Sequence, residues 1–229
     1  MKLGIVLPSY MYSDERKRLA SQAFYSLMDT EPLQQEVRLL LLVKYGRTQE
    51  YLSLLDGLSR KFNVILKTDE GLNGTEQTLA FGTHFLFENF GLDYVTWMGD
   101  DALFHPLWLW KLESLIRRRP QARSWSVYRS AFEFVHRTLK IEEEDVLVRS
   151  ICGHGMTLSQ QEWKEWGVDW RTGSWGCHQG DTLDLVHSEV RPGERWVTKE
   201  SWVQHTGRTG VHCTVDIPEY ARDFQVVES

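Results

Sequence analysis

The sequence lacks the apolar run of about 20 residues that a membrane-spanning helix needs. Its first eight residues are too short for a secretory signal and are typical of a buried strand. Only three cysteines are present. Few cysteines without a secretory signal indicate a reducing compartment. We therefore expect a cytoplasmic protein with no transmembrane segment.

The sequence also lacks an excess of positive charge, since 26 Lys and Arg stand against 32 Asp and Glu, for a net charge of −6. This balance disfavours a protein that coats nucleic acid through its overall field. The basic run at 117–119 is interpreted as a helix C-terminus, because Pro120 follows it. Internal repeats and linkers are absent too, so the 229 residues fit one domain.

Strand and helix patterns alternate through the first 120 residues. A continuous apolar run predicts a buried strand over 3–7, and segments rich in apolar and β-forming residues predict further strands over 37–43, 64–66 and 94–98. Apolar residues at helical spacing predict helices that begin near residues 13, 51, 75 and 106. Repeated βαβ units of this kind build a parallel sheet with helices on both faces.

The second half of the chain has a different composition, rich in Trp, Gly and His, and its apolar runs are shorter. We expect residues 124–135 and 145–151 to pair as antiparallel strands, and 160–166 to form a helix. Residues 171–181 and 204–213 are expected to be polar, glycine-rich loops. The fold class predicted from both halves is α/β.

Two adjacent carboxylates, Asp100 and Asp101, follow the fourth predicted strand. In open α/β sheets, ligands bind at the carboxyl ends of the strands. Buried carboxylates are costly to leave unpaired, and a divalent cation is their usual partner. The pair therefore predicts a cation site, with a helix N-cap ahead of Pro106 as the alternative.

These features together resemble the GT-A glycosyltransferases, most closely glycosyltransferase family 2, over about residues 3–210. The most specific match is residues 97–108, where the family carries an Asp-x-Asp or Asp-Asp-Asp cluster. Since Gly99 occupies the first acidic position, the resemblance implies that Asp101 binds the metal and that Asp100 lies near the nucleotide ribose. It also implies a mixed, mainly parallel sheet flanked by helices.

The same resemblance implies one catalytic domain over residues 1–229. Residues 1–120 would bind the nucleoside-diphosphate sugar, and 121–229 would bind the acceptor and carry the catalytic groups. Two weaker matches supply the donor contacts, which are Pro8, Ser9 and Tyr10 in the first loop, and Asn73 and Gly74 at a helix start.

Three later residues complete the implied site. Asp181 matches the family's catalytic base, His205 matches a late metal-binding histidine, and Arg208 is placed to neutralise the diphosphate. Mn²⁺ or Mg²⁺ suits a site that bridges carboxylates and diphosphate oxygens, and a histidine ligand favours Mn²⁺. Two of these residues have a structural alternative: Asp181 as a helix cap and His205 as an ordinary loop histidine.

The implied function is transfer of a sugar to a hydroxyl acceptor with inversion at the anomeric carbon. The acceptor is left open between a saccharide, a protein and a modified nucleic-acid base. A nucleotidyltransferase is disfavoured, because the segment after the first strand, residues 8–13, has no glycine. Gly99, Lys44 and Gly180 stand where the family is usually acidic, which leaves a non-catalytic nucleotide-sugar-binding module as an alternative.

A structural zinc site is a further alternative, because each cysteine lies close to a histidine, in the segments 152–154, 177–178 and 212–213. No Cys-x₂-Cys pair is present, which disfavours it.

Overall fold

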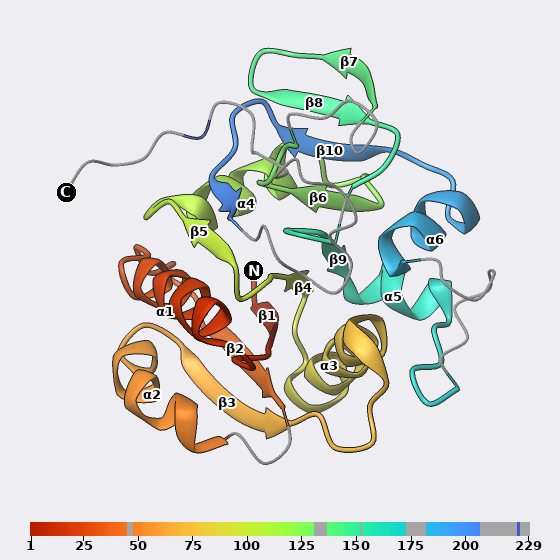
Figure 1. The fold of residues 1–229 in the computed structure, drawn as a ribbon. Helices are drawn as coiled ribbons and strands as arrows, with labels where there is room; N and C mark the ends of the chain where they lie inside the picture. Colours follow the sequence, from red (N-terminus) through yellow and green to blue (C-terminus); the bar gives the residue numbers. More distant parts are fainter. Residues whose placement is uncertain (45–47, 131–136, 152, 173–181, 207–223, 225–229) are drawn as a thin grey trace.

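Figure 1 shows a computed structural model of the chain. The structure describes residues 1–44, 48–130, 137–151, 153–172, 182–206 and 224. Within these ranges, no helix combines the length and the apolar character that crossing a membrane requires.

The first half of the chain forms the predicted βα series. Four parallel strands lie in the order β3-β2-β1-β4, and their bounds are β1 Leu3–Ser9, β2 Val37–Val43, β3 Asn63–Thr68 and β4 Tyr94–Trp97. The elements between them are α1 Asp14–Met28, the 3₁₀ helix η1 Thr48–Tyr51, α2 Leu52–Ser59 and α3 Gly74–Phe90. The predicted second strand has the observed bounds, and all of its residues except the half-buried Arg38 are apolar and buried.

The second half extends the same sheet, in the order β4-β9-β6-β10-β8-β7 (Figure 1). Its strands are β6 Ser124–Ser126, β7 Thr138–Ile141, β8 Asp145–Val148, β9 Thr157–Ser159 and β10 Arg195–Thr198. Its helices are α4 Trp108–Arg118, α5 Gln160–Trp166 and α6 Leu183–Val190. A separate two-stranded sheet joins β5 Ala102–Phe104 to β11 Val203–His205. The sheet is mixed and mostly parallel in its first half, which confirms the predicted fold class.

One predicted pairing is wrong. The strands from 124 and from 145 are not neighbours, because β10 lies between them, parallel to β6 and antiparallel to β8. The partner of β8 on its other side is β7. Residues 203–205, expected in part to be a loop, form β11.

Two apolar layers hold the sheet. Residues of α1, α2 and α4 pack on one face, against side chains such as Ile5 and Leu39. Residues of α3, α5 and α6 pack on the other face, against side chains such as Val6 and Leu40. Neighbouring residues of β1 and β2 therefore contribute to opposite layers, as expected for strands buried on both faces. The layers leave the loops at the carboxyl ends of β1 and β4 to form a site.

Candidate functional site

Asp101 and His205 are brought together by the small sheet. Asp101 directly precedes β5, and His205 pairs with Ala102 at the end of β11. The backbone carbonyl of Asp101 accepts hydrogen bonds from the backbone N–H and the Oγ1 of Thr206, both at 2.8 Å. Asp101 Oδ2 then lies 3.3 Å from His205 Nε2. The structure places the two predicted metal ligands side by side; their metal role stays a prediction.

His154 is a third member of this cluster; the sequence indicated it only as part of the disfavoured zinc alternative and not as a partner of Asp101. It lies shortly before β9. There the backbone N–H of Trp97 donates to the carbonyl of Met156, and the N–H of Gly155 donates to the carbonyl of Trp97 at 2.7 Å. Gly155 has φ +79, a conformation that favours glycine. The His154 ring stacks on that of His205, with centroids 4.1 Å apart.

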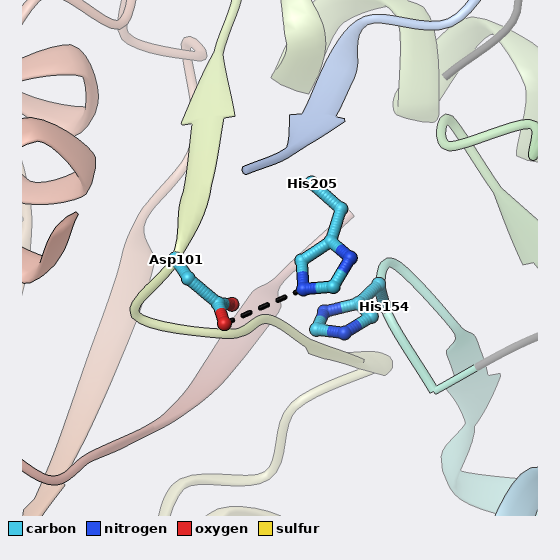
Figure 2. A group of neighbouring side chains, drawn as sticks. All are labelled: Asp101, His154 and His205. Carbon is cyan, nitrogen blue, oxygen red and sulfur yellow. Dashed lines mark ion pairs between the residues drawn. The ribbon is translucent and has the colours of Figure 1, made fainter. Parts of the chain in front are cut away.

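Figure 2 shows Asp101, His154 and His205 pointing toward one another from three separate segments. One ligand atom of each lies within 4.8 Å of the others. An arrangement of one carboxylate and two imidazoles fits a divalent cation such as Mn²⁺ better than Mg²⁺, which prefers oxygen ligands. The donor set is therefore suited to a metal.

Packing around the cluster explains why residue 99 is a glycine. A Cβ added there would lie 2.6 Å from Asp101 Oδ1 and 2.8 Å from His154 Cε1. Any side chain at residue 99 would force at least one of these groups to shift. The chain therefore lacks the usual first acidic residue at the position where His154 approaches Asp101.

Asp100 joins the end of β4 to the loop after β1. Its Oδ2 accepts from Ser9 Oγ at 2.7 Å and from the N–H of Tyr10 at 3.0 Å. Tyr51 donates to the Ser9 carbonyl at 2.9 Å and so supports the same loop. Burial raises the pKa of Asp100 to about 6, although the Arg16 charge and these hydrogen bonds lower it. The predicted ribose contact is not tested by these bonds and stays a prediction.

Arg16 of α1 contacts both carboxylates. Its Nη2 pairs with Asp100 Oδ1, and its Nη1 lies 2.8 Å from Asp101 Oδ2. Burial acts to raise the pKa of Asp101, but the hydrogen bond from His205 and the charges of His205, His154 and Arg16 hold it well below its usual range. Sequence reasoning missed Arg16, because it lies in a run of charged residues at a helix start.

Two of the predicted donor-binding residues, Ser9 and Tyr10, contact Asp100 beside this centre. Tyr10 OH is hydrogen-bonded to Thr78 Oγ1 at 3.1 Å, so the first loop meets the start of α3. Asn73 is the N-cap of α3 and Gly74 its first residue, with φ +78. Pro8 is buried within β1. Asp181, Arg208 and the three cysteines lie outside the described residues.

Lys44 directly follows β2, where the family usually has an acid. Its Nζ lies 3.6 Å from Oδ2 of the buried Asp69, which follows β3. A carboxylate is therefore present beside this position, but it comes from the neighbouring strand.

The sheet order and the position of the cluster define a GT-A fold. No protein-family model and no curated protein matches the sequence. Among solved structures, S. aureus TarS 1–349 in complex with UDP-GlcNAc has a TM-score of 0.66 and 11% identity. That match covers 93% of this chain and 61% of the TarS fragment.

Two further structures show the same fold. The same TarS fragment in complex with UDP matches with a TM-score of 0.60 and 10% identity, over 89% of this chain and 60% of the fragment. A197 from STIV matches with a TM-score of 0.51 and 10% identity, over 89% of this chain and 84% of its own. The chain thus spans about three fifths of the TarS fragment, and these similarities establish its fold.

Proposed function

We propose that the chain is a metal-dependent, inverting glycosyltransferase that moves a sugar from a nucleoside-diphosphate sugar to a hydroxyl acceptor. The observation that carries the proposal is the Asp101–His154–His205 cluster at the carboxyl end of β4 in a GT-A fold. The UDP-GlcNAc bound to TarS supports a nucleotide sugar as the donor class.

The cluster residues hold Mn²⁺ or Mg²⁺ in this proposal. A bound divalent cation stabilises the negative charge that develops on the leaving diphosphate. Tyr10, with the start of α3 that it contacts, forms one wall for the nucleotide. Arg208 adds a positive charge to the diphosphate end.

Asp181 is the proposed general base, and it immediately precedes Thr182, the N-cap of α6. The acceptor oxygen forms a bond to the anomeric carbon as the bond from that carbon to the diphosphate oxygen breaks. The acceptor proton passes to the Asp181 carboxylate, and attack opposite the leaving group inverts the configuration. General-base assistance of this kind contributes about 10²–10⁴-fold in rate.

A thermal-shift screen tests the proposal. Wild-type protein is heated with UDP-GlcNAc and other nucleotide sugars, with and without Mn²⁺. A separate turnover assay measures the nucleoside diphosphate released in the presence of saccharide, protein or modified-DNA acceptors. A ligand at 100 times its Kd adds about 2.7 kcal/mol of stability. We expect stabilisation that requires Mn²⁺ and is lost in Asp101→Ala.

The matched control is Asp56→Ala, which removes an exposed carboxylate on α2. It is expected to keep the full Mn²⁺-dependent shift. Equal shifts for Asp101→Ala and wild type would contradict the metal assignment. Stabilisation without any released diphosphate would favour a non-catalytic nucleotide-sugar-binding module.

A further inference from the structure

Arg16 occupies an unusual place for a charged side chain. It lies on the buried face of α1, one turn before Leu19 and Ala20, and is only 8% exposed. Ser13 Oγ accepts from its backbone N–H at 3.2 Å, so the residue sits in the first turn of the helix. A guanidinium removed from water is costly unless it is paired, so its partners explain its position.

One of these partners, Asp101, belongs to the proposed metal site, and the other, Asp100, is its neighbour in the chain. Arg16 spans the acidic pair, with one terminal nitrogen on Asp100 and the other on Asp101. The Asp101 oxygen that it contacts at 2.8 Å is Oδ2, which also faces His205 Nε2 at 3.3 Å. The guanidinium and the imidazole therefore converge on one carboxylate oxygen.

We propose that Arg16 is the resident counter-cation of the Asp100–Asp101 pair and competes with the divalent cation for Asp101 Oδ2. This inference rests on the metal site of the proposed function. Two buried carboxylates carry two negative charges, and Arg16 cancels one of them before any metal binds. In the metal-bound state the guanidinium keeps Asp100, whose Oδ2 is already occupied by Ser9 and Tyr10.

The consequence is a metal site that is weak by itself. With Arg16 paired, the cation meets a smaller negative charge and must displace a charge-assisted hydrogen bond. The diphosphate of a donor brings additional negative charge, so metal and donor should bind together more tightly than either does alone. Arg16 also keeps the acidic pair stable in the metal-free protein.

The test is Mn²⁺ binding to the full chain without donor, measured by electron paramagnetic resonance of free Mn²⁺. Arg16→Met keeps the apolar stem and removes the charge. We expect it to bind Mn²⁺ tighter than wild type, on the order of tenfold. Its Tm without metal should fall by about 10 °C, because the buried carboxylates lose their partner, and Mn²⁺ should restore more of that loss than it adds to wild type.

Arg18→Met is the matched control. Arg18 lies on the exposed side of the same helix, and its Nη1 contacts Gln22. Losing its charge should leave both Mn²⁺ affinity and Tm near wild type. If Arg16→Met does not fold, Arg16→Lys replaces it, since an ammonium contacts one carboxylate at a time; a smaller gain in Mn²⁺ affinity is expected.

The outcomes separate this inference from the proposed function. Unchanged or weaker Mn²⁺ binding in the folded Arg16 variant would overturn the competition, while wild type still binds Mn²⁺ through Asp101. Absence of Mn²⁺ binding that depends on Asp101 in wild type and in the Arg16 variant would overturn the metal site itself.

Discussion

Gly99→Ala is the substitution that probes the geometry of the cluster most sharply. The added Cβ would lie 2.6 Å from Asp101 Oδ1 and 2.8 Å from His154 Cε1, inside van der Waals contact. Asp101 is held by Arg16 and by Thr206, so it has little room to move away. Overpacking of this kind costs about 1–3 kcal/mol.

The effect on metal binding should exceed the effect on folding. Displacing a ligand or its support typically lowers metal affinity by about 10–100-fold, and we expect that range for Mn²⁺ here. Unfolding in urea measures the stability change, and Mn²⁺ titration measures the affinity.

The control for Gly99→Ala is Gly153→Ala, next to His154, where an added Cβ meets nothing within 4 Å. It should leave Mn²⁺ affinity near wild type. If Gly99→Ala binds Mn²⁺ as tightly as wild type, the glycine at residue 99 is not required for His154 to approach Asp101.

Three further predictions concern other parts of the chain. Burial raises the pKa of Glu76 to about 7, so its contribution to stability is present below pH 4.5 and is lost as pH rises through 7. In Glu76→Gln this loss of up to about 3 kcal/mol should disappear from urea unfolding curves measured across pH 4.5–8. A pH profile of stability unchanged from wild type would contradict this prediction. Asp145→Asn should lower the free energy of unfolding by about 2–4 kcal/mol, because the buried carboxylate pairs with Arg118 and Arg119, while Mn²⁺ affinity stays unchanged. A decrease below 0.5 kcal/mol (roughly the level of a neutral surface substitution) would count against this. Asp181→Asn should abolish turnover and keep donor binding, measured by diphosphate release and thermal shift, and substantial turnover would reject the base assignment.

Local patterns were enough to predict the first half of the fold. The apolar runs of β1 and β2 and the helical spacing in α1 are properties of neighbouring residues, and the structure confirms these elements. The acidic pair was placed correctly at the carboxyl end of β4 for the same reason. The parallel pairing of β4 with β1 then brings it beside the loop after β1.

The remaining features depend on contacts between distant segments. β10 enters between β6 and β8 from residues 195–198, which no local pattern indicates. His154 joins the cluster only because β9 pairs with β4, although glycines at 99 and 155 are a signal in hindsight. Arg16 was hidden because a charged residue at a helix start is normally exposed, and its burial follows from the carboxylates above it.

In the proposed function, Asp101, His154 and His205 together bind the metal that serves the donor diphosphate. A crystal structure with UDP and Mn²⁺, with the manganese located by its anomalous scattering, tests it most directly. We expect one manganese ion bound by an Asp101 oxygen, by one nitrogen from each histidine, and by the diphosphate. A manganese ion bound elsewhere, or UDP bound with none of these three side chains near the metal, would contradict it.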